Sequence, residues 1–189
     1  MKKYSRTLSI IIFCIGMIAV YQHTFVTTPC LPEKTSYQVC FTPGEDCTQL
    51  VINAIHAAKN TIYMQAYSFT SAPIARALVQ AKHRGVEVKI ILDKSQVKSN
   101  QYSVARYLVN NSIDPWVDYR PAIAHNKVMI IDSSIVMTGS FNFTKAAQMH
   151  NAENLLIISN RDLARKYFEN WANRLKKSKP TMTYLKSKK

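Results

Sequence analysis

Hydrophobic and polar positions repeat with two different periods along this chain, and the two periods alternate. Short runs rich in β-branched and aromatic residues, such as Thr61–Tyr67 and Val86–Leu92, predict strands. Longer segments with apolar residues at every third or fourth position predict helices between them. We expect strands at 37–41, 61–67, 86–92, 117–119, 127–131, 135–138 and 154–158, and helices at 46–59, 71–85, 102–110 and 161–177.

The order of these elements predicts the fold class. Strands and helices alternate in the first half, and a hairpin around Asp132 follows in the second half. This order favours an α/β fold in which a mixed β-sheet is flanked by helices on both faces. A chain of 189 residues with 47% apolar content suits one such domain, which we assign to residues 35–177.

The N-terminus has the pattern of an export signal. Lys2, Lys3 and Arg6 precede Leu8–Val20, an apolar run that is short for a permanent membrane span. We therefore interpret residues 1–25 as a signal peptide or an uncleaved signal anchor, with a buried core helix as the alternative. Because the positive end stays in the cytoplasm, both forms of signal predict an exported domain that is periplasmic, secreted or anchored facing outward.

The net charge of +14 is unevenly distributed, with 25 Lys and Arg against 11 Asp and Glu. Residues 174–189 contain seven Lys or Arg and no acid, so the attraction to polyanions is concentrated in this tail. We expect residues 178–189 to lack regular structure. The tail either keeps the chain soluble or binds DNA or an anionic membrane.

Three cysteines follow the apolar segment. Cys40 and Cys47 bracket a turn-rich loop and could form a disulfide in an oxidising compartment, which leaves Cys30 unpaired or paired between chains. Two unpaired buried thiols are an equal alternative. A zinc site is disfavoured because no His lies near these cysteines.

Most of the candidate chemistry lies between residues 125 and 153. His125 and Lys127 stand at the start of one strand, and Gly139 permits a tight backbone at the end of the next. Ser140 and Asn142 then add a hydroxyl and an amide. These side chains supply many donors and little negative charge, which suits a phosphate that gains charge in the transition state.

The same residues form the pattern His-x-Lys-(x4)-Asp-(x6)-Gly-Ser-x-Asn, by which the chain resembles the phospholipase D superfamily. The resemblance covers residues 37–175. Within it, residues 65–70, 139–147 and 151–155 are similar to the small exported bacterial endonuclease branch. Members of that branch carry the motif once, whereas most lipases of the superfamily are longer and carry it twice. The resemblance therefore implies a phospholipase D-like fold and phosphodiester hydrolysis.

Four roles at the phosphate are implied by the resemblance. His125 is similar to the nucleophile that forms a phosphohistidine intermediate. Lys127 and Asn142 look like the clamps on the phosphate oxygens, and Ser140 looks like a supporting donor. Each residue alone has an ordinary explanation as a surface or turn residue, but the joint spacing disfavours coincidence.

Two acidic residues complete the implied site. Asp132 resembles the motif aspartate, which supports the site structurally. Glu153 stands eleven residues after Asn142, as does the family carboxylate that orients the nucleophilic histidine. A carboxylate on one ring nitrogen fixes the tautomer and makes the other nitrogen a better nucleophile.

A single motif also predicts a partner. The mechanism needs a nucleophile on one side of phosphorus and a proton donor on the other, and the chain supplies one site histidine, so we expect a homodimer with one composite site. No acidic cluster indicates a metal, and we expect no cofactor. The leading hypothesis is a non-specific endonuclease acting on DNA or RNA. The alternatives are a phospholipase at a membrane, held by the N-terminal segment or the tail, and a non-catalytic nucleic-acid-binding protein.

Overall fold

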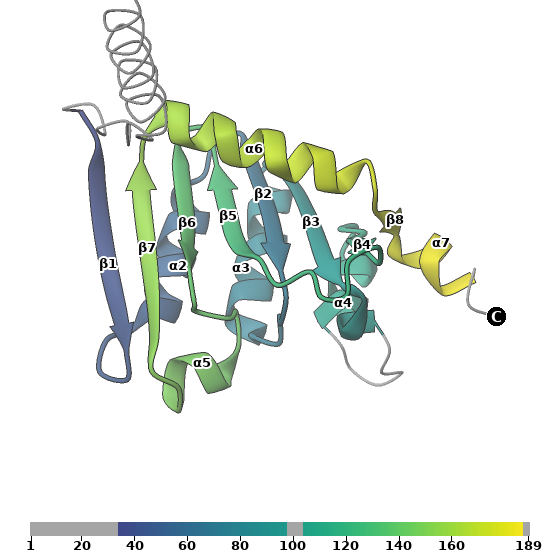
Figure 1. The fold of residues 1–189 in the computed structure, drawn as a ribbon, viewed down its shortest axis with the longest axis horizontal. Coiled ribbons are helices and arrows are strands. Elements are labelled where there is room, and N and C mark those ends of the chain that lie inside the picture. The colour runs from purple at the N-terminus through teal and green to yellow at the C-terminus, as the bar shows by residue number, and fades with distance from the viewer. Residues whose placement is uncertain (1–33, 98–103, 187–189) are drawn as a thin grey trace, which may run out of the picture. The chain divides into compact units, whose positions relative to one another are not determined.

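The computed structural model describes residues 34–97 and 104–186, with side chains as far as residue 183. Eight strands form one sheet in the order β1-β7-β6-β5-β2-β3-β4-β8 (Figure 1). The strands are β1 (Ser36–Thr42), β2 (Thr61–Ala66), β3 (Glu87–Asp93), β4 (Trp116–Asp118), β5 (Lys127–Ile131), β6 (Ile135–Gly139), β7 (Glu153–Ser159) and β8 (Lys179–Pro180). The helices are α2 (Cys47–Ala57), α3 (Ala72–His83), α4 (Val104–Asn110), α5 (Lys145–Met149), α6 (Arg161–Leu175) and α7 (Thr181–Lys186), with a short 3₁₀ turn at Lys94–Val97.

The sheet is mixed, as the sequence predicts. β2, β3 and β4 run parallel, whereas every other neighbouring pair is antiparallel. Lys127 at the start of β5 pairs with Ala66 at the end of β2, and Gly139 at the end of β6 pairs with Leu155 near the start of β7. Four strand ends therefore meet at one edge of the sheet.

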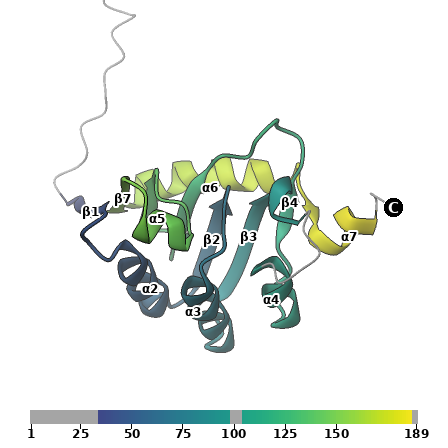
Figure 2. The ribbon, with the colours of Figure 1, turned by 90° about the horizontal axis from the view of Figure 1, so that it is seen from below.

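Helices cover both faces of the sheet, which confirms the predicted fold class. Figures 1 and 2 show α6 crossing one face and α2, α3 and α4 lying against the other. The larger apolar cluster, which includes Ile55, Leu78 and Met129, is packed with α2 and α3. A smaller cluster lies under α6, where Trp171 packs with Ile130 and its Nε1 donates to the Met64 carbonyl at 3.1 Å.

Polar residues fix where the helices begin. Asp46 accepts from the backbone N–H of Gln49 at 2.9 Å, and Ser71 accepts from that of Ile74. Asn160 accepts from Leu163 in the same way at the start of α6. Each cap satisfies a backbone donor that has no partner within its own helix, worth about 1 kcal/mol.

The structure joins Cys40 to Cys47 by a disulfide, with 5.7 Å between their Cα atoms. The bridge links edge strand β1 to the first residue of α2, and both cysteines are buried. Cys30 lies outside the described residues, so its state stays a prediction. The interpretation of residues 1–25 as a signal lies outside them as well.

The expectation of an irregular tail from residue 178 was wrong for residues 179–186. Lys179 pairs with Val117, so β8 adds a strand at the edge of β4, and α7 follows directly. Thr181, the first residue of α7, anchors this segment, because its backbone N–H and its hydroxyl both donate to the Pro115 carbonyl, at 2.9 and 2.6 Å. The prediction rested on the high lysine content of residues 178–189, which does not reveal contacts with distant segments such as β4. Among the described residues, no helix is both long and apolar enough to cross a membrane.

Candidate active site

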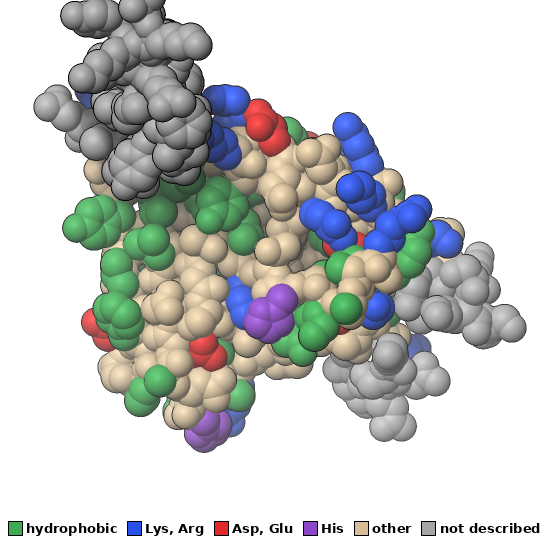
Figure 3. Space-filling model, viewed as in Figure 1, with side chains coloured by type: hydrophobic (Ala, Val, Ile, Leu, Met, Phe, Trp, Pro, Cys, Tyr) green, Lys and Arg blue, Asp and Glu red, His purple; other side chains and the backbone are tan. Residues whose placement is uncertain are grey.

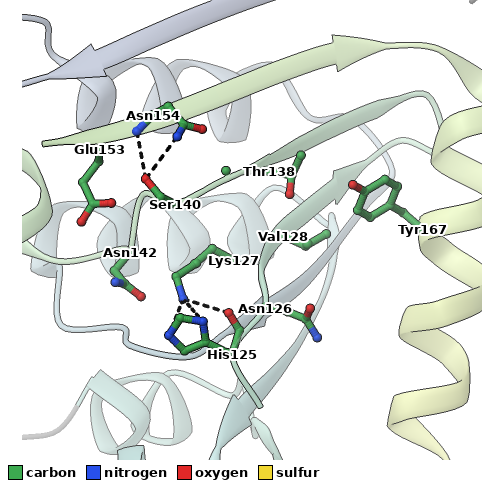
Figure 4. Close-up of a pocket in the computed structure, with 11 residues that line it drawn as sticks. His125, Asn126, Lys127, Val128, Thr138, Ser140, Asn142, Glu153, Asn154 and Tyr167 are labelled. Atoms are coloured by element: carbon green, nitrogen blue, oxygen red, sulfur yellow. Dashed lines mark hydrogen bonds between the residues drawn. The ribbon is translucent and has the colours of Figure 1, made fainter. Parts of the chain in front are cut away.

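A pocket of about 700 Å³ opens at the edge where β5 and β7 begin and β6 ends (Figure 4). Its walls come from three strands, the loops beside them and one residue of α6. The lining residues are His125, Asn126, Lys127, Val128, Thr138, Gly139, Ser140, Asn142, Glu153, Asn154 and Tyr167. Five of the six site residues expected from the sequence therefore share one pocket.

His125 and Lys127 lie side by side in this pocket. The Lys127 ammonium donates to the His125 carbonyl at 2.8 Å and lies 3.1 and 3.2 Å from the two ring nitrogens. His125 is exposed, whereas Lys127 is 7% exposed. The imidazole can reach a substrate from solvent while a cation stands directly beside it.

Tyr67, which the expected site does not include, supports this pair. Its ring lies 4.3 Å from the His125 ring centroid and 4.8 Å from the Lys127 ammonium. The Tyr67 backbone N–H also donates to the Asn126 carbonyl at 2.9 Å. One signal in the sequence could have found Tyr67, because it lies within residues 65–70, which are similar to the endonuclease branch.

The electrostatics of Lys127 follow from its position. Burial lowers the pKa of Lys127 below its ordinary value, because the desolvated ammonium loses hydration, and the negative charge of Glu153 opposes that change. A buried ammonium facing a pocket attracts a phosphate oxygen strongly, since little water screens its charge.

Asn142 and Ser140 supply two further polar groups. The Asn142 side-chain oxygen is buried and has no partner within the described part of the chain. Ser140 Oγ accepts from the backbone N–H of Asn154 at 3.0 Å, which holds the hydroxyl in the pocket wall. The Ser140 proton and the Asn142 amide protons are available to a ligand. Asn154 is a supporting residue that the expected site did not contain.

Glu153 lines the pocket, but the structure does not bring it into contact with His125 among the interactions of the described residues. Its carboxylate accepts from the Asn151 side-chain amide at 2.9 Å and acts on Lys127 through its charge. The expected orientation of the histidine by Glu153 stays a prediction.

Gly139 sets the spacing between β6 and β7 at the pocket. Its φ is +149°, and a Cβ at this position would lie 2.3 Å from the Asn154 carbonyl oxygen. That oxygen accepts from the backbone N–H groups of Ser140 and Phe141, both at 3.1 Å. A side chain at residue 139 would therefore displace the strand that positions Ser140.

Asp132 lies away from the pocket, at the opposite end of β5. Its carboxylate accepts from three consecutive backbone N–H groups, those of Lys59, Asn60 and Thr61, at 2.7–2.9 Å. Burial alone raises the pKa of Asp132, but these donors together with the Lys59 charge hold it below its ordinary value. The residue ties the β5–β6 hairpin to the start of β2 and has a structural role.

The arrangement can bind an anion and attack it. One exposed imidazole, one buried ammonium, three hydroxyls and three side-chain amides line the same space, with a single carboxylate among them. In residues 34–97 and 104–186, no group of three His, Cys, Asp or Glu side chains could hold a metal ion. The donors present can neutralise a phosphate by themselves.

Comparison with known families agrees with this geometry. The family model described as "Cardiolipin synthase, PLD-like domain" matches residues 51–175. A protein of Rickettsia felis named "Phospholipase D" is 48% identical over 141 residues, which cover 75% of this chain and 70% of that protein.

Two solved structures share the fold. Nuc from Salmonella typhimurium, described as a phospholipase D family member, is 40% identical with a TM-score of 0.73, over 78% of this chain and 98% of that chain. NucT from Helicobacter pylori is 27% identical with a TM-score of 0.72, over 78% and 99% respectively. Both alignments span nearly the whole length of the solved chains.

Proposed function

Because the chain belongs to the phospholipase D superfamily and is a phosphodiester hydrolase, we propose that it is an endonuclease that cleaves DNA or RNA with little sequence preference. The observation that carries this proposal is the convergence of exposed His125 with buried Lys127 and the Asn142 amide in one pocket. The similarity of residues 65–70, 139–147 and 151–155 to the small exported endonuclease branch favours nucleic acid over lipid as the substrate.

The proposed reaction has two steps. First, an imidazole nitrogen of His125 bonds to phosphorus, and the bond to the leaving oxygen breaks with its electrons on that oxygen, which takes up a proton. Second, a water oxygen attacks phosphorus and gives a proton to the group that protonated the leaving oxygen, while the phosphorus–nitrogen bond breaks with its electrons on nitrogen and restores the imidazole. Lys127, Asn142 and Ser140 stabilise the non-bridging oxygens throughout. No divalent metal is needed, so cleavage proceeds in EDTA.

The leaving oxygen needs a proton donor opposite the nucleophile, and the pocket contains one histidine. We assign that role to His125 of a second copy, which makes the active form a two-fold homodimer with one composite site. Surface chemistry beside the pocket supports this assignment. On β1, Tyr37, Val39 and Phe41 are 72%, 37% and 57% exposed, whereas Cys40 and Thr42 on the same strand are buried. Phe41 pairs with Asn154 of the pocket wall.

A lipid substrate is the second candidate, favoured by the names of the matched family and of the rickettsial relative. The same donors would hold a phosphatidyl phosphate. An exported location, and membrane attachment through residues 1–25, belong to both candidates as proposals. The non-catalytic nucleic-acid-binding protein considered from the sequence disagrees with membership of this family of hydrolases and with the pocket chemistry, and the assay below tests it as well.

One paired assay separates the three. The full chain is incubated in EDTA with supercoiled plasmid and, in parallel, with vesicles that contain cardiolipin and phosphatidylcholine. We expect nicked and linear plasmid and no released head group. Lipid hydrolysis without nicking would overturn the nuclease proposal in favour of a phospholipase, and plasmid binding without either product would favour the non-catalytic protein.

A further inference from the structure

We propose that Arg120 and Lys179 form a secondary binding site for the phosphate backbone of a nucleic-acid strand, beside the pocket and separate from it. This inference rests on the proposed nuclease function and deepens it, because it says from which side the strand enters. Neither residue lines the pocket or belongs to the superfamily pattern.

The two cations are held on one aromatic ring. The Arg120 guanidinium lies 5.6 Å from the centroid of the Tyr119 ring, and the Lys179 ammonium lies 5.1 Å from it. Tyr119 follows β4, and Lys179 belongs to β8, which pairs with β4. The additional strand at the sheet edge therefore brings a lysine from the C-terminal segment to an arginine in the middle of the chain.

Two carboxylates at the paired ends of β3 and β4 already have partners. Asp118 is buried and accepts two hydrogen bonds from Arg174, at 2.6 and 2.7 Å. Asp93 is buried and accepts from the backbone N–H groups of Ser95 and Ala124, at 2.8 and 2.7 Å. Among the described residues, neither Arg120 nor Lys179 forms an ion pair, so their positive charges remain available to a ligand.

A fixed loop connects this site to the nucleophile. Arg120 and His125 are five residues apart, so their Cα atoms are separated by at most about 18 Å. The loop between them is tied down twice, because Lys94 Nζ donates to the Pro121 carbonyl at 2.8 Å and the Ala124 N–H donates to Asp93. A strand with its scissile phosphate at His125 would place a phosphate a few nucleotides away within reach of Arg120 and Lys179.

Charge on the visible face supports entry from this side. Figure 3 shows Lys and Arg side chains gathered over the C-terminal half of α6 and hydrophobic side chains gathered over β1. The exposed side chains of β1 that we assign to the second copy include Tyr37 and Phe41. A polyanion is therefore attracted to the β4 and β8 side, while the β1 side offers it little charge.

The test is the salt dependence of binding in the full chain carrying His125→Ala, which binds a single-stranded oligonucleotide without cutting it. We compare Arg120→Gln/Lys179→Gln with Arg76→Gln/Lys82→Gln, a matched pair that removes the same charge from exposed positions on α3, which covers the other face of the sheet from α6 (Figure 2). Between about 50 and 200 mM salt, the slope of log affinity against log salt should become shallower by about 1.4 in the first pair only.

A second readout uses the same pairs with His125 intact. The ratio of kcat/KM for the oligonucleotide to that for bis(4-nitrophenyl) phosphate, which is too small to reach Arg120, should fall about tenfold in the first pair. Equal slopes and ratios in the two pairs, with wild type still cutting plasmid, would overturn this inference alone. If the Arg120→Gln/Lys179→Gln variant lost binding to cardiolipin vesicles while its oligonucleotide slope stayed unchanged, the inference would also be overturned, because the two cations would then bind lipid. A wild-type chain that cuts no plasmid overturns the proposed function, and the slopes still test this site.

Discussion

The two ends of β5 carry residues of the same sequence motif, but the structure uses them in opposite ways. At the first end, Lys127 is buried beside an exposed imidazole and faces a pocket. At the other end, Asp132 has its carboxylate occupied by three backbone N–H groups. One end keeps polar groups available to a substrate, whereas the other uses them to join two segments of the fold. A motif therefore marks positions that matter without saying whether they matter to chemistry or to folding.

The largest effect should come from the start of β5, where His125 lies beside Lys127. His125→Ala should lower cleavage of plasmid by more than about 10³-fold, because it removes the nucleophile. The melting temperature should hardly change, since the side chain is exposed. His83→Ala, an exposed histidine on α3, is the matched control and should keep full activity. Retention of a tenth of wild-type activity by His125→Ala would contradict the assignment.

The structural end should respond in stability. Asp132→Ala leaves three backbone donors without their acceptor and should lower the free energy of unfolding by about 2 kcal/mol, measured by urea denaturation. Asp132→Asn keeps one side-chain acceptor and tolerates the positive φ of 49°, so it should lose about half as much. Asp162→Ala, on the exposed surface of α6, should lose less than about 1 kcal/mol.

The pH dependence of the same variants gives a second check. Because the pKa of Asp132 is lowered in the folded protein, its stabilisation is present above the unfolded pKa and is lost as pH falls through the folded pKa. Wild type should therefore lose more stability than Asp132→Asn on acidification. Parallel acid profiles, or a large loss of kcat in folded Asp132→Asn, would place Asp132 with the residues at the start of β5 instead.

A smaller effect concerns the charge that acts on Lys127. Glu153 raises the pKa of Lys127 against the effect of burial, so Glu153→Gln should lower that pKa further. If charged Lys127 binds the phosphate, the alkaline fall in kcat/KM moves to lower pH in this variant. Glu169→Gln, whose carboxylate pairs with Arg165, should leave the profile in place. If kcat/KM of Glu153→Gln fell at the same alkaline pH as that of wild type, the charge of Glu153 would have no effect on the function of Lys127.

The smallest effect separates one chain from two. When His125→Ala and wild-type subunits exchange, a composite site leaves activity only in wild-type pairs, so equal mixing should leave about a quarter of the activity. Independent sites would leave about a half. Subunit exchange is confirmed with mass-labelled subunits. As a separate check of the interface, Phe41→Ser, which replaces an exposed ring on β1, should shift the sedimentation coefficient toward that of a monomer. A linear loss of activity with exchange complete would rule out the composite site.

Much of the fold and site could be predicted because local patterns specify them. Runs of β-branched and aromatic residues identified β2 and β3, and α2 and α3 start within one residue of the expected positions 46 and 71. The motif together with Glu153 supplied five residues of one pocket. The remainder depends on contacts between distant segments, which no local pattern encodes. Tyr67 meets His125 only after β2 pairs with β5, and Lys179 becomes a strand residue only beside β4.

Gly139 adds a different kind of information to the motif. Because residue 139 has no Cβ, the Asn154 carbonyl can lie close to its Cα. That carbonyl accepts hydrogen bonds from the backbone N–H groups of Ser140 and Phe141. The absence of a side chain at residue 139 therefore lets β6 and β7 approach each other closely at the pocket. The spacing between these two strands depends on the backbone there. Transferring only the histidine, lysine and asparagine to another sheet would therefore reproduce the functional groups without the close strand spacing that positions them.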